Sequence, residues 1–125
     1  MQNIFNTMLA GMIAQNAFGY NPDLDTCQYF APDGRRCAVG QLAASDEIAK
    51  EWEENELSVE QVAANIGVTD KRTIELMGAI QAEHDYHARH DPENAAGEAD
   101  FEQFINEVRK IGACFSLNIH TAFTK

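Results

Sequence analysis

Apolar side chains recur every three or four residues along most of this chain, which is the spacing that predicts amphipathic α-helices. The pattern is clear over residues 2–18, and it returns near the C-terminus, where Phe101, Phe104 and Val108 share one helical face. Capping residues and helix breakers set the ends of the other helical segments. The pattern predicts helices over residues 2–18, about 46–55, 58–67, 69–90 and 98–112.

Two serine residues predict where two of these helices begin. Ser45 stands before Asp46 and Glu47, which is an N-cap residue followed by acids that favour the positive end of the helix dipole. Ser58 is followed three residues later by Gln61, and this pair forms a capping-box pattern. Both serines therefore mark helix starts within the range that the apolar spacing predicts.

The segment after the first helix has the composition of a tight β-hairpin. A Pro-Asp-Gly sequence suits a three-residue turn, because proline presets φ and glycine tolerates a positive φ. In a hairpin over residues 27–38, Ala31 would face Arg35 and Tyr29 would face Cys37. With 125 residues the chain fits one domain, residues 1–125. The predicted fold is mainly α, a single-domain helical bundle with one small β-hairpin near residues 27–38.

Cys27 and Cys37 flank the predicted turn as diagonal neighbours, roughly 7 to 8 Å apart, which is long for a disulfide. They are either small apolar residues beneath the hairpin, metal ligands or reactive thiols. His84, His87 and His90 follow one another at one-turn spacing, and such groups can share a divalent ion with carboxylates. We expect no cofactor and no catalytic residue, and the alternative is a zinc site formed by Cys27, Cys37 and His84.

The chain is strongly acidic, with 20 Asp and Glu against 9 Lys and Arg and a formal net charge of -11. Such a surface repels phosphate backbones, which disfavours direct binding to nucleic acid. Between residues 46 and 60, seven acids accompany Lys50 alone. This stretch is either a solvated helix face or a surface for a basic protein partner. The expected partner-binding residues are Glu51, Glu53, Glu54 and Glu56, with Met8 and Met12 as a second surface.

Charge and hydropathy also predict a location. The first basic residue is Arg35, so the start of the chain lacks the cationic segment of a secretory signal. No apolar run approaches the roughly 20 residues that span a bilayer. Three cysteines leave one outside any pairing, which favours a reducing compartment. We therefore expect a protein of the host-cell cytoplasm that does not bind membranes.

The chain resembles a loose group of uncharacterised small phage and bacterial proteins. The shared features are a Cys-x-Tyr, Asp-Gly and Cys-Ala-Val-Gly hairpin segment, a Leu, Gln, His-Asp helix and a Phe-x-x-Phe helix. The matching residues are Cys27, Tyr29, Asp33, Gly34, residues 37–40, Leu76, Gln81, His84, Asp85, Phe101 and Phe104. The resemblance implies a phage-related origin and brings no established activity. It also suggests that His84 or Asp85 touches the hairpin in a structural polar network.

Together these features favour a phage-derived acidic accessory protein that acts by binding another protein. Its partner would be a host defence enzyme or a nucleic-acid enzyme, which it inhibits or redirects, and its charge would speed their encounter. The first alternative is a metal-binding or thiol-dependent module that uses Cys27, Cys37 and His84. The second alternative is a virion component that forms a homo-oligomer through its N-terminal helix.

Overall fold

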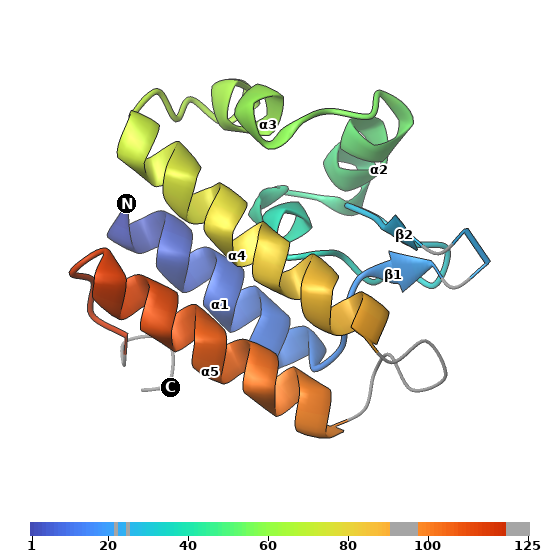
Figure 1. The fold of residues 1–125 in the computed structure, drawn as a ribbon. Helices are drawn as coiled ribbons and strands as arrows, with labels where there is room; N and C mark the ends of the chain where they lie inside the picture. The colour runs from blue at the N-terminus through green and yellow to red at the C-terminus, as the bar shows by residue number, and fades with distance from the viewer. Residues whose placement is uncertain (22, 25, 91–97, 120–125) are drawn as a thin grey trace.

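The computed structural model of the chain describes residues 1–21, 23–24, 26–90 and 98–119, and its elements surround a hydrophobic core (Figure 1). Their order is α1 (Gln2–Gln15), β1 (Tyr20–Asn21), β2 (Thr26–Cys27), the 3₁₀ helix η1 (Val39–Leu42), α2 (Asp46–Glu54), α3 (Val59–Asn65), α4 (Lys71–His90) and α5 (Glu98–Cys114). The predicted fold class, a mainly helical protein with a small antiparallel hairpin, is confirmed.

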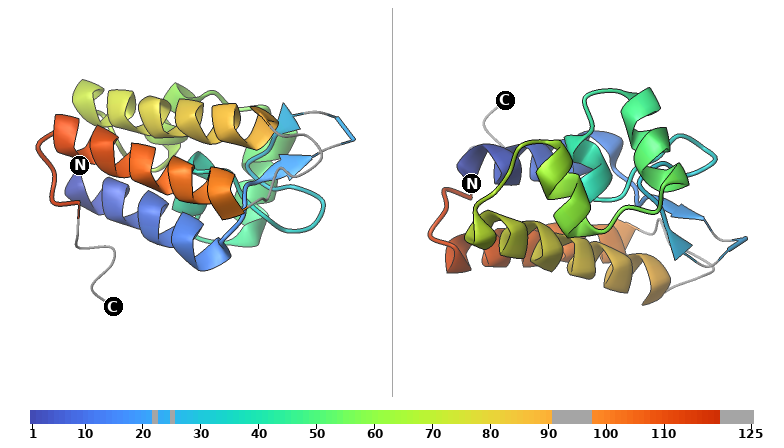
Figure 2. Two further views of the ribbon diagram at one scale, coloured as in Figure 1. Left: turned by 60° about the horizontal axis from the view of Figure 1, so that its bottom comes forward. Right: turned by 90° about the horizontal axis from the view of Figure 1, so that it is seen from above.

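Three helices form the centre of the fold. Helices α1, α4 and α5 run side by side, and each contacts the other two (Figure 2). Helix α3 packs on α4, and η1 packs on both α1 and α4. Fully buried side chains between these elements include Phe5, Met8, Leu9, Met12, Leu76, Met77, Ile80 and Phe104. Each such side chain contributes about 1.5–3 kcal/mol relative to exposure, so burial is the main stabilising term here.

The methionines of α1 lie in this core. Met8 is 0% exposed and Met12 is 1% exposed, so the prediction that they form a second partner surface is wrong. Their apolar face is covered by the helices that pack against α1. The uncharged polar side of α1 is also used within the molecule, since the Gln15 side chain binds the backbone of Arg36 on both its N–H and its carbonyl.

The starts of α2 and α3 agree with the predicted caps. The Ser45 hydroxyl accepts a hydrogen bond from the N–H of Ile48, and both reciprocal bonds of the Ser58 and Gln61 capping box are present. Helix α1 ends earlier than predicted, because Asn16 adopts a left-handed conformation with φ of 54°. Among the described residues, no helix has both the length and the apolar character needed to cross a membrane.

The hairpin lies earlier in the chain than predicted. Its register pairs Tyr20 with Cys27, so the predicted strands over residues 27–38 are wrong. The Pro-Asp-Gly turn does form, since the N–H of Ala31 donates to the carbonyl of Arg35 at 2.8 Å. The predicted register is not kept beyond the turn, because the Cys37 N–H donates to the carbonyl of Gln28 at 3.0 Å and the Tyr29 N–H donates to the Glu53 carboxylate at 2.6 Å.

Candidate functional site

A pocket of about 410 Å³ opens between β2, the segment joining α2 to α3, and α4. Its volume lies within the range of small-molecule sites in proteins. We call it the thiol pocket, because two cysteines lie in its wall. The residues that line it are Cys27, Tyr29, Cys37, Glu53, Glu56, Leu57, Ser58, Val59, Gln81 and Asp85. It is the part of the described chain that gathers the most groups capable of chemistry.

Helix α4 supplies two polar residues of the pocket from one face. Gln81 and Asp85 are four residues apart, a spacing that places both side chains on the same side of a helix. The Gln81 amide donates to Asp85 Oδ1 at 2.7 Å, and its carbonyl oxygen accepts the N–H of Val39 at 2.8 Å. Gln81 therefore fixes the Asp85 carboxylate and at the same time holds the start of η1.

His84 lies behind the pocket and is fully buried. Its Nε2 accepts the N–H of Gly19 at 3.0 Å, so the ring proton must be on Nδ1, which lies 3.2 Å from Asp85 Oδ1. Burial lowers the pKa of His84 below its ordinary value, although the hydrogen bond with Asp85 offsets part of this effect. His84 is therefore a neutral imidazole that accepts from the backbone and donates to a carboxylate.

Gly19 makes this arrangement possible. A Cβ atom at this position would lie 2.2 Å from the carbonyl carbon of Arg36 and 2.2 Å from the nitrogen of Cys37. Both are backbone atoms, so the clash could not be relieved by a side-chain rotation. Only glycine lets the two segments approach closely enough for its N–H to reach His84.

Asp85 is the fixed anion of the pocket. Burial by itself would raise the pKa of this carboxyl, but hydrogen bonds from His84, Cys27 and Gln81 outweigh burial and hold the pKa below its usual range. Its side chain is 38% exposed, so the charge remains accessible from solvent. The network thus stabilises a carboxylate at the pocket wall in a single orientation.

The remaining groups favour binding over nucleophilic chemistry. Cys37 is 1% exposed, and burial raises the pKa of its thiol to about 12, so it stays protonated at neutral pH. Burial also raises the pKa of Tyr29, whose hydroxyl donates to the carbonyl of Leu57. His84 cannot act as a base toward Cys27, because both of its ring nitrogens are already committed.

The structure brings together a different set of possible metal ligands from the predicted set of Cys27, Cys37 and His84. Ligand atoms of Cys27, His84 and Asp85 lie within 4.8 Å of one another, so Asp85 takes the place predicted for Cys37. A histidine ligand must offer a lone pair to the ion and usually donates its other N–H to an acceptor. His84 has the opposite polarity, since its Nε2 accepts the Gly19 N–H. The geometry therefore fits a hydrogen-bond network better than a metal centre. His87 is not part of this cluster, and its Nε2 lies 3.3 Å from Glu83 Oε2.

The four acids predicted to bind a partner separate into two groups. Glu53 is half-buried and its carboxylate is occupied by the Tyr29 N–H, whereas Glu51, Glu54 and Glu56 are exposed. Within the described part of the chain, none of these three exposed acids forms an ion pair. The structure thus presents a negative surface on α2 and the segment after it, and two of the predicted residues, Glu53 and Glu56, also line the thiol pocket.

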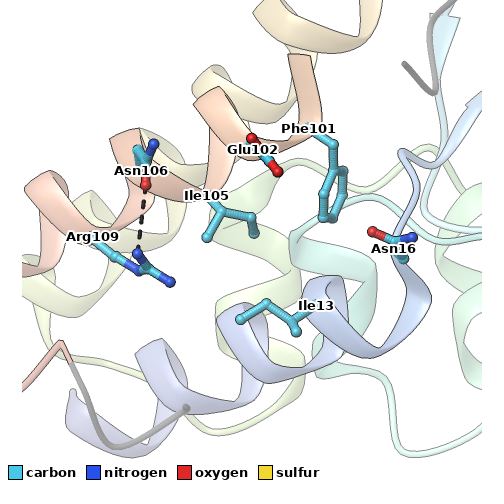
Figure 3. Close-up of a pocket in the computed structure, with 7 residues that line it drawn as sticks. All are labelled: Ile13, Asn16, Phe101, Glu102, Ile105, Asn106 and Arg109. Carbon is cyan, nitrogen blue, oxygen red and sulfur yellow. Dashed lines mark hydrogen bonds between the residues drawn. The ribbon is translucent and has the colours of Figure 1, made fainter. Parts of the chain in front are cut away.

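A second hollow of about 460 Å³ lies between α1 and α5 (Figure 3). Ile13 points from α1 toward Ile105 and Phe101 of α5, and the Arg109 guanidinium donates to Asn106 at its edge. Its walls combine these apolar side chains with the polar side chains of Asn16, Glu102, Asn106 and Arg109. Nothing in the described chain shows what would occupy it.

No protein-family model, curated protein or solved structure matches this chain. The resemblance to small phage proteins stays a prediction, and the site stands on its own geometry. Sequence reasoning placed His84 or Asp85 beside the hairpin but missed the role of Gly19. The only sign of this role in the sequence was that Gly19 directly follows the predicted first helix. A glycine at such a position is also explained as a simple helix terminator.

Proposed function

We propose that this protein is an acidic accessory protein that binds a basic surface of another protein through α2 and the segment that joins α2 to α3. The observation that carries the proposal is the set of exposed carboxylates Glu51, Glu54 and Glu56, which have no ion-pair partner among the described residues. Carboxylates that are not neutralised within the molecule attract a positively charged surface and speed its encounter.

The acids are presented on a well-anchored element. Trp52, on the opposite side of α2, is 1% exposed, and its indole N–H donates to Asn65 of α3 at 3.3 Å. The N-cap bond of Ser45 fixes the start of the helix. A rigid charged face loses little conformational freedom on binding, which favours recognition by this surface.

The charge of the chain also restricts the partner. With a formal net charge of -11, the protein repels nucleic acid but complements a protein surface that normally holds it. The resemblance to phage proteins supports a host defence enzyme or nucleic-acid enzyme as this partner, which the accessory protein would inhibit or redirect. The expected site of action is the host cytoplasm.

The test compares two charge reversals of equal size. Glu51→Lys with Glu54→Lys changes the proposed surface, and Glu75→Lys with Glu102→Lys changes exposed acids elsewhere. A partner captured from host lysate is identified by mass spectrometry, and its affinity is then measured at several salt concentrations. The α2 variant should weaken binding by at least about tenfold and flatten the salt dependence. Equal losses in both variants, or none in either, would reject α2 as the interface.

A metal-binding or thiol-dependent module is the second candidate, favoured by the proximity of Cys27, His84 and Asp85. A zinc ion would require His84 to give up its bond with Gly19 or its Nδ1 proton. Elemental analysis of untagged protein tests this candidate, because a stoichiometric metal that disappears in Cys27→Ser would support it.

A virion component that self-associates through α1 is less well supported, because the apolar face of α1 is buried within the molecule. A monomeric mass in solution would count against it.

A further inference from the structure

We propose that the thiol pocket receives one arginine side chain of the protein partner. This inference rests on the proposed function and adds the chemistry of the anchoring residue. Its basis is a concave site in which three carboxylates line a volume of about 410 Å³. Glu56 is exposed, Glu53 is half-buried, and Asp85 lies on α4 with a side chain that is 38% exposed.

The pocket has a single sign of charge. Glu53, Glu56 and Asp85 line it, and no lysine or arginine is among the described residues that do so. Beyond the effect of burial, the charges of Glu53 and Asp85 also raise the pKa of both Tyr29 and Cys37. The negative potential therefore reaches across the pocket and would favour a cationic group over a neutral or anionic one.

The walls suit a long side chain with a charged end. Leu57 and Val59 provide apolar surface, against which methylene groups of a basic side chain can pack. Asp85 lines the same pocket with an accessible carboxylate. A bound side chain could thus bury its stem and place its charge against a fixed anion.

The fixed orientation of Asp85 favours a guanidinium group. Hydrogen bonds from Gln81 and His84 both reach its Oδ1, which prevents the carboxylate from reorienting when a ligand enters. A guanidinium group is planar and weakly hydrated, and it pairs best with a carboxylate of set geometry. A metal ion is the weaker alternative, because the proton on His84 Nδ1 removes one of the three ligands in the cluster.

The experiment uses the full chain labelled with ¹⁵N and two small probes at constant ionic strength. N-acetyl-arginine amide carries the guanidinium, and N-acetyl-citrulline amide is a neutral molecule of nearly the same shape. The arginine probe should cause saturable amide shifts at Cys27, Gln81 and Asp85, with a dissociation constant in the millimolar range that is typical of weak fragments. The citrulline probe should bind at least about tenfold more weakly.

Three variants locate the binding site of the arginine probe. Asp85→Asn should weaken binding by about tenfold or more, because it removes the oriented charge. Glu56→Gln should weaken it about two- to fivefold, and this exposed residue can change without disturbing the fold. Glu75→Gln, an exposed acid of α4 outside the pocket, is the matched control and should leave binding unchanged. Glu56→Gln keeps the proposal testable even if Asp85→Asn does not fold.

Several results would overturn this inference. Equal binding of both probes, no binding of arginine, or identical effects of Glu56→Gln and Glu75→Gln would each do so. The proposed function fails separately. If arginine does not enter the pocket while reversal of Glu51 and Glu54 still abolishes partner capture, the acidic surface stands and the arginine pocket falls. If arginine binds but the reversal changes nothing, the pocket stands and α2 is not the interface.

Discussion

The helical bundle, or apolar half, and the loop segment after α1, or polar half, are each stabilised by a different kind of interaction. The bundle of α1, α4 and α5 is packed through apolar side chains, whereas the described residues from Gly19 to Val39, which leave out 22 and 25, form only the short strands β1 and β2 and the start of η1 (Figure 1). In that segment, helix side chains bind backbone N–H groups that a regular sheet would pair with carbonyls. The four pairs are Gly19 with His84, Tyr29 with Glu53, Arg36 with Gln15, and Val39 with Gln81. Irregular backbone can thus be packed against a core when neighbouring helices supply acceptors for it.

This difference explains where the candidate site lies. Apolar packing is non-directional and tolerates adjustment, but a hydrogen bond sets the position and orientation of each partner. Three of the four acceptor residues, Glu53, Gln81 and His84, line the thiol pocket or lie directly behind it. The polar groups that hold the loops in place therefore also orient the groups that face solvent in the pocket.

The largest effect is expected in the apolar half, from Phe104→Ala. Phe104 is 0% exposed, and its ring packs edge-on against Phe18, with centroids 5.5 Å apart, and against His84 at 5.8 Å. Its loss should lower the free energy of unfolding by about 3–5 kcal/mol. Chemical denaturation measures this change, and Gln103→Ala on the exposed side of α5 should stay within about 0.5 kcal/mol of the original protein. Similar small losses in both variants would show that the bundle does not depend on this contact.

The sequence was sufficient to predict the helices of the apolar half because the signals there are local. The apolar spacing lies within each helix, and the capping and helix-breaking residues lie within a few residues of its ends, as Ser45 and Ser58 show. Met8 and Met12 follow the same spacing, but their assignment to a partner surface was wrong, because the helices that cover them are not placed by a local pattern. The existence of the helices was therefore predicted, whereas what covers their apolar faces was not.

The polar half could not be predicted to the same degree, because its contacts join distant residues. The turn at residues 32–34 was found, but the strands were displaced, since the Tyr29 N–H binds a carboxylate 24 residues away. The cluster around His84 contains Asp85 in place of the predicted Cys37. The segment that carries Cys37 is positioned by a long-range contact, since the N–H of the preceding residue, Arg36, donates to Gln15 of α1. Each of these outcomes depends on the packing of whole helices, which no local pattern encodes.

A smaller effect is expected in the polar half, from Gly19→Ala. The added Cβ would lie 2.2 Å from backbone atoms of residues 36 and 37, so the segments must separate and the bond to His84 must weaken. We expect a loss of about 1–3 kcal/mol in the free energy of unfolding. The control is Gly78→Ala within α4, where an added Cβ would meet no atom within 4 Å besides its chain neighbours and the backbone of its own helix, and alanine should stabilise the helix by up to about 1 kcal/mol. A neutral result for Gly19→Ala would mean that the close approach is not maintained in solution.

The smallest effect is a pH dependence that is specific to the polar half. The pKa of His84 is lowered in the folded protein, mainly by burial, whereas in the unfolded chain it is near its ordinary value of about 6.5. As the pH falls through that value, the unfolded chain takes up a proton that the folded protein does not. Stability should therefore fall with decreasing pH, by at most about 1.4 kcal/mol per unit. The pKa of Asp85 is lowered as well, so its contribution is lost only at a more acidic pH, near and below its ordinary value of about 4.

His84→Gln separates this titration from the hydrogen bonds. A glutamine amide can still accept the N–H of Gly19 and donate to Asp85, but it does not titrate. Denaturation curves between pH 5 and pH 8 should show a steeper loss of stability for the original protein than for the His84→Gln variant. The two curves should converge toward the acidic end, because the original protein loses there the advantage that its neutral imidazole gave. Parallel curves across this range would mean that His84 takes up its proton equally well in both states, and that it is not held as a neutral acceptor for the loop.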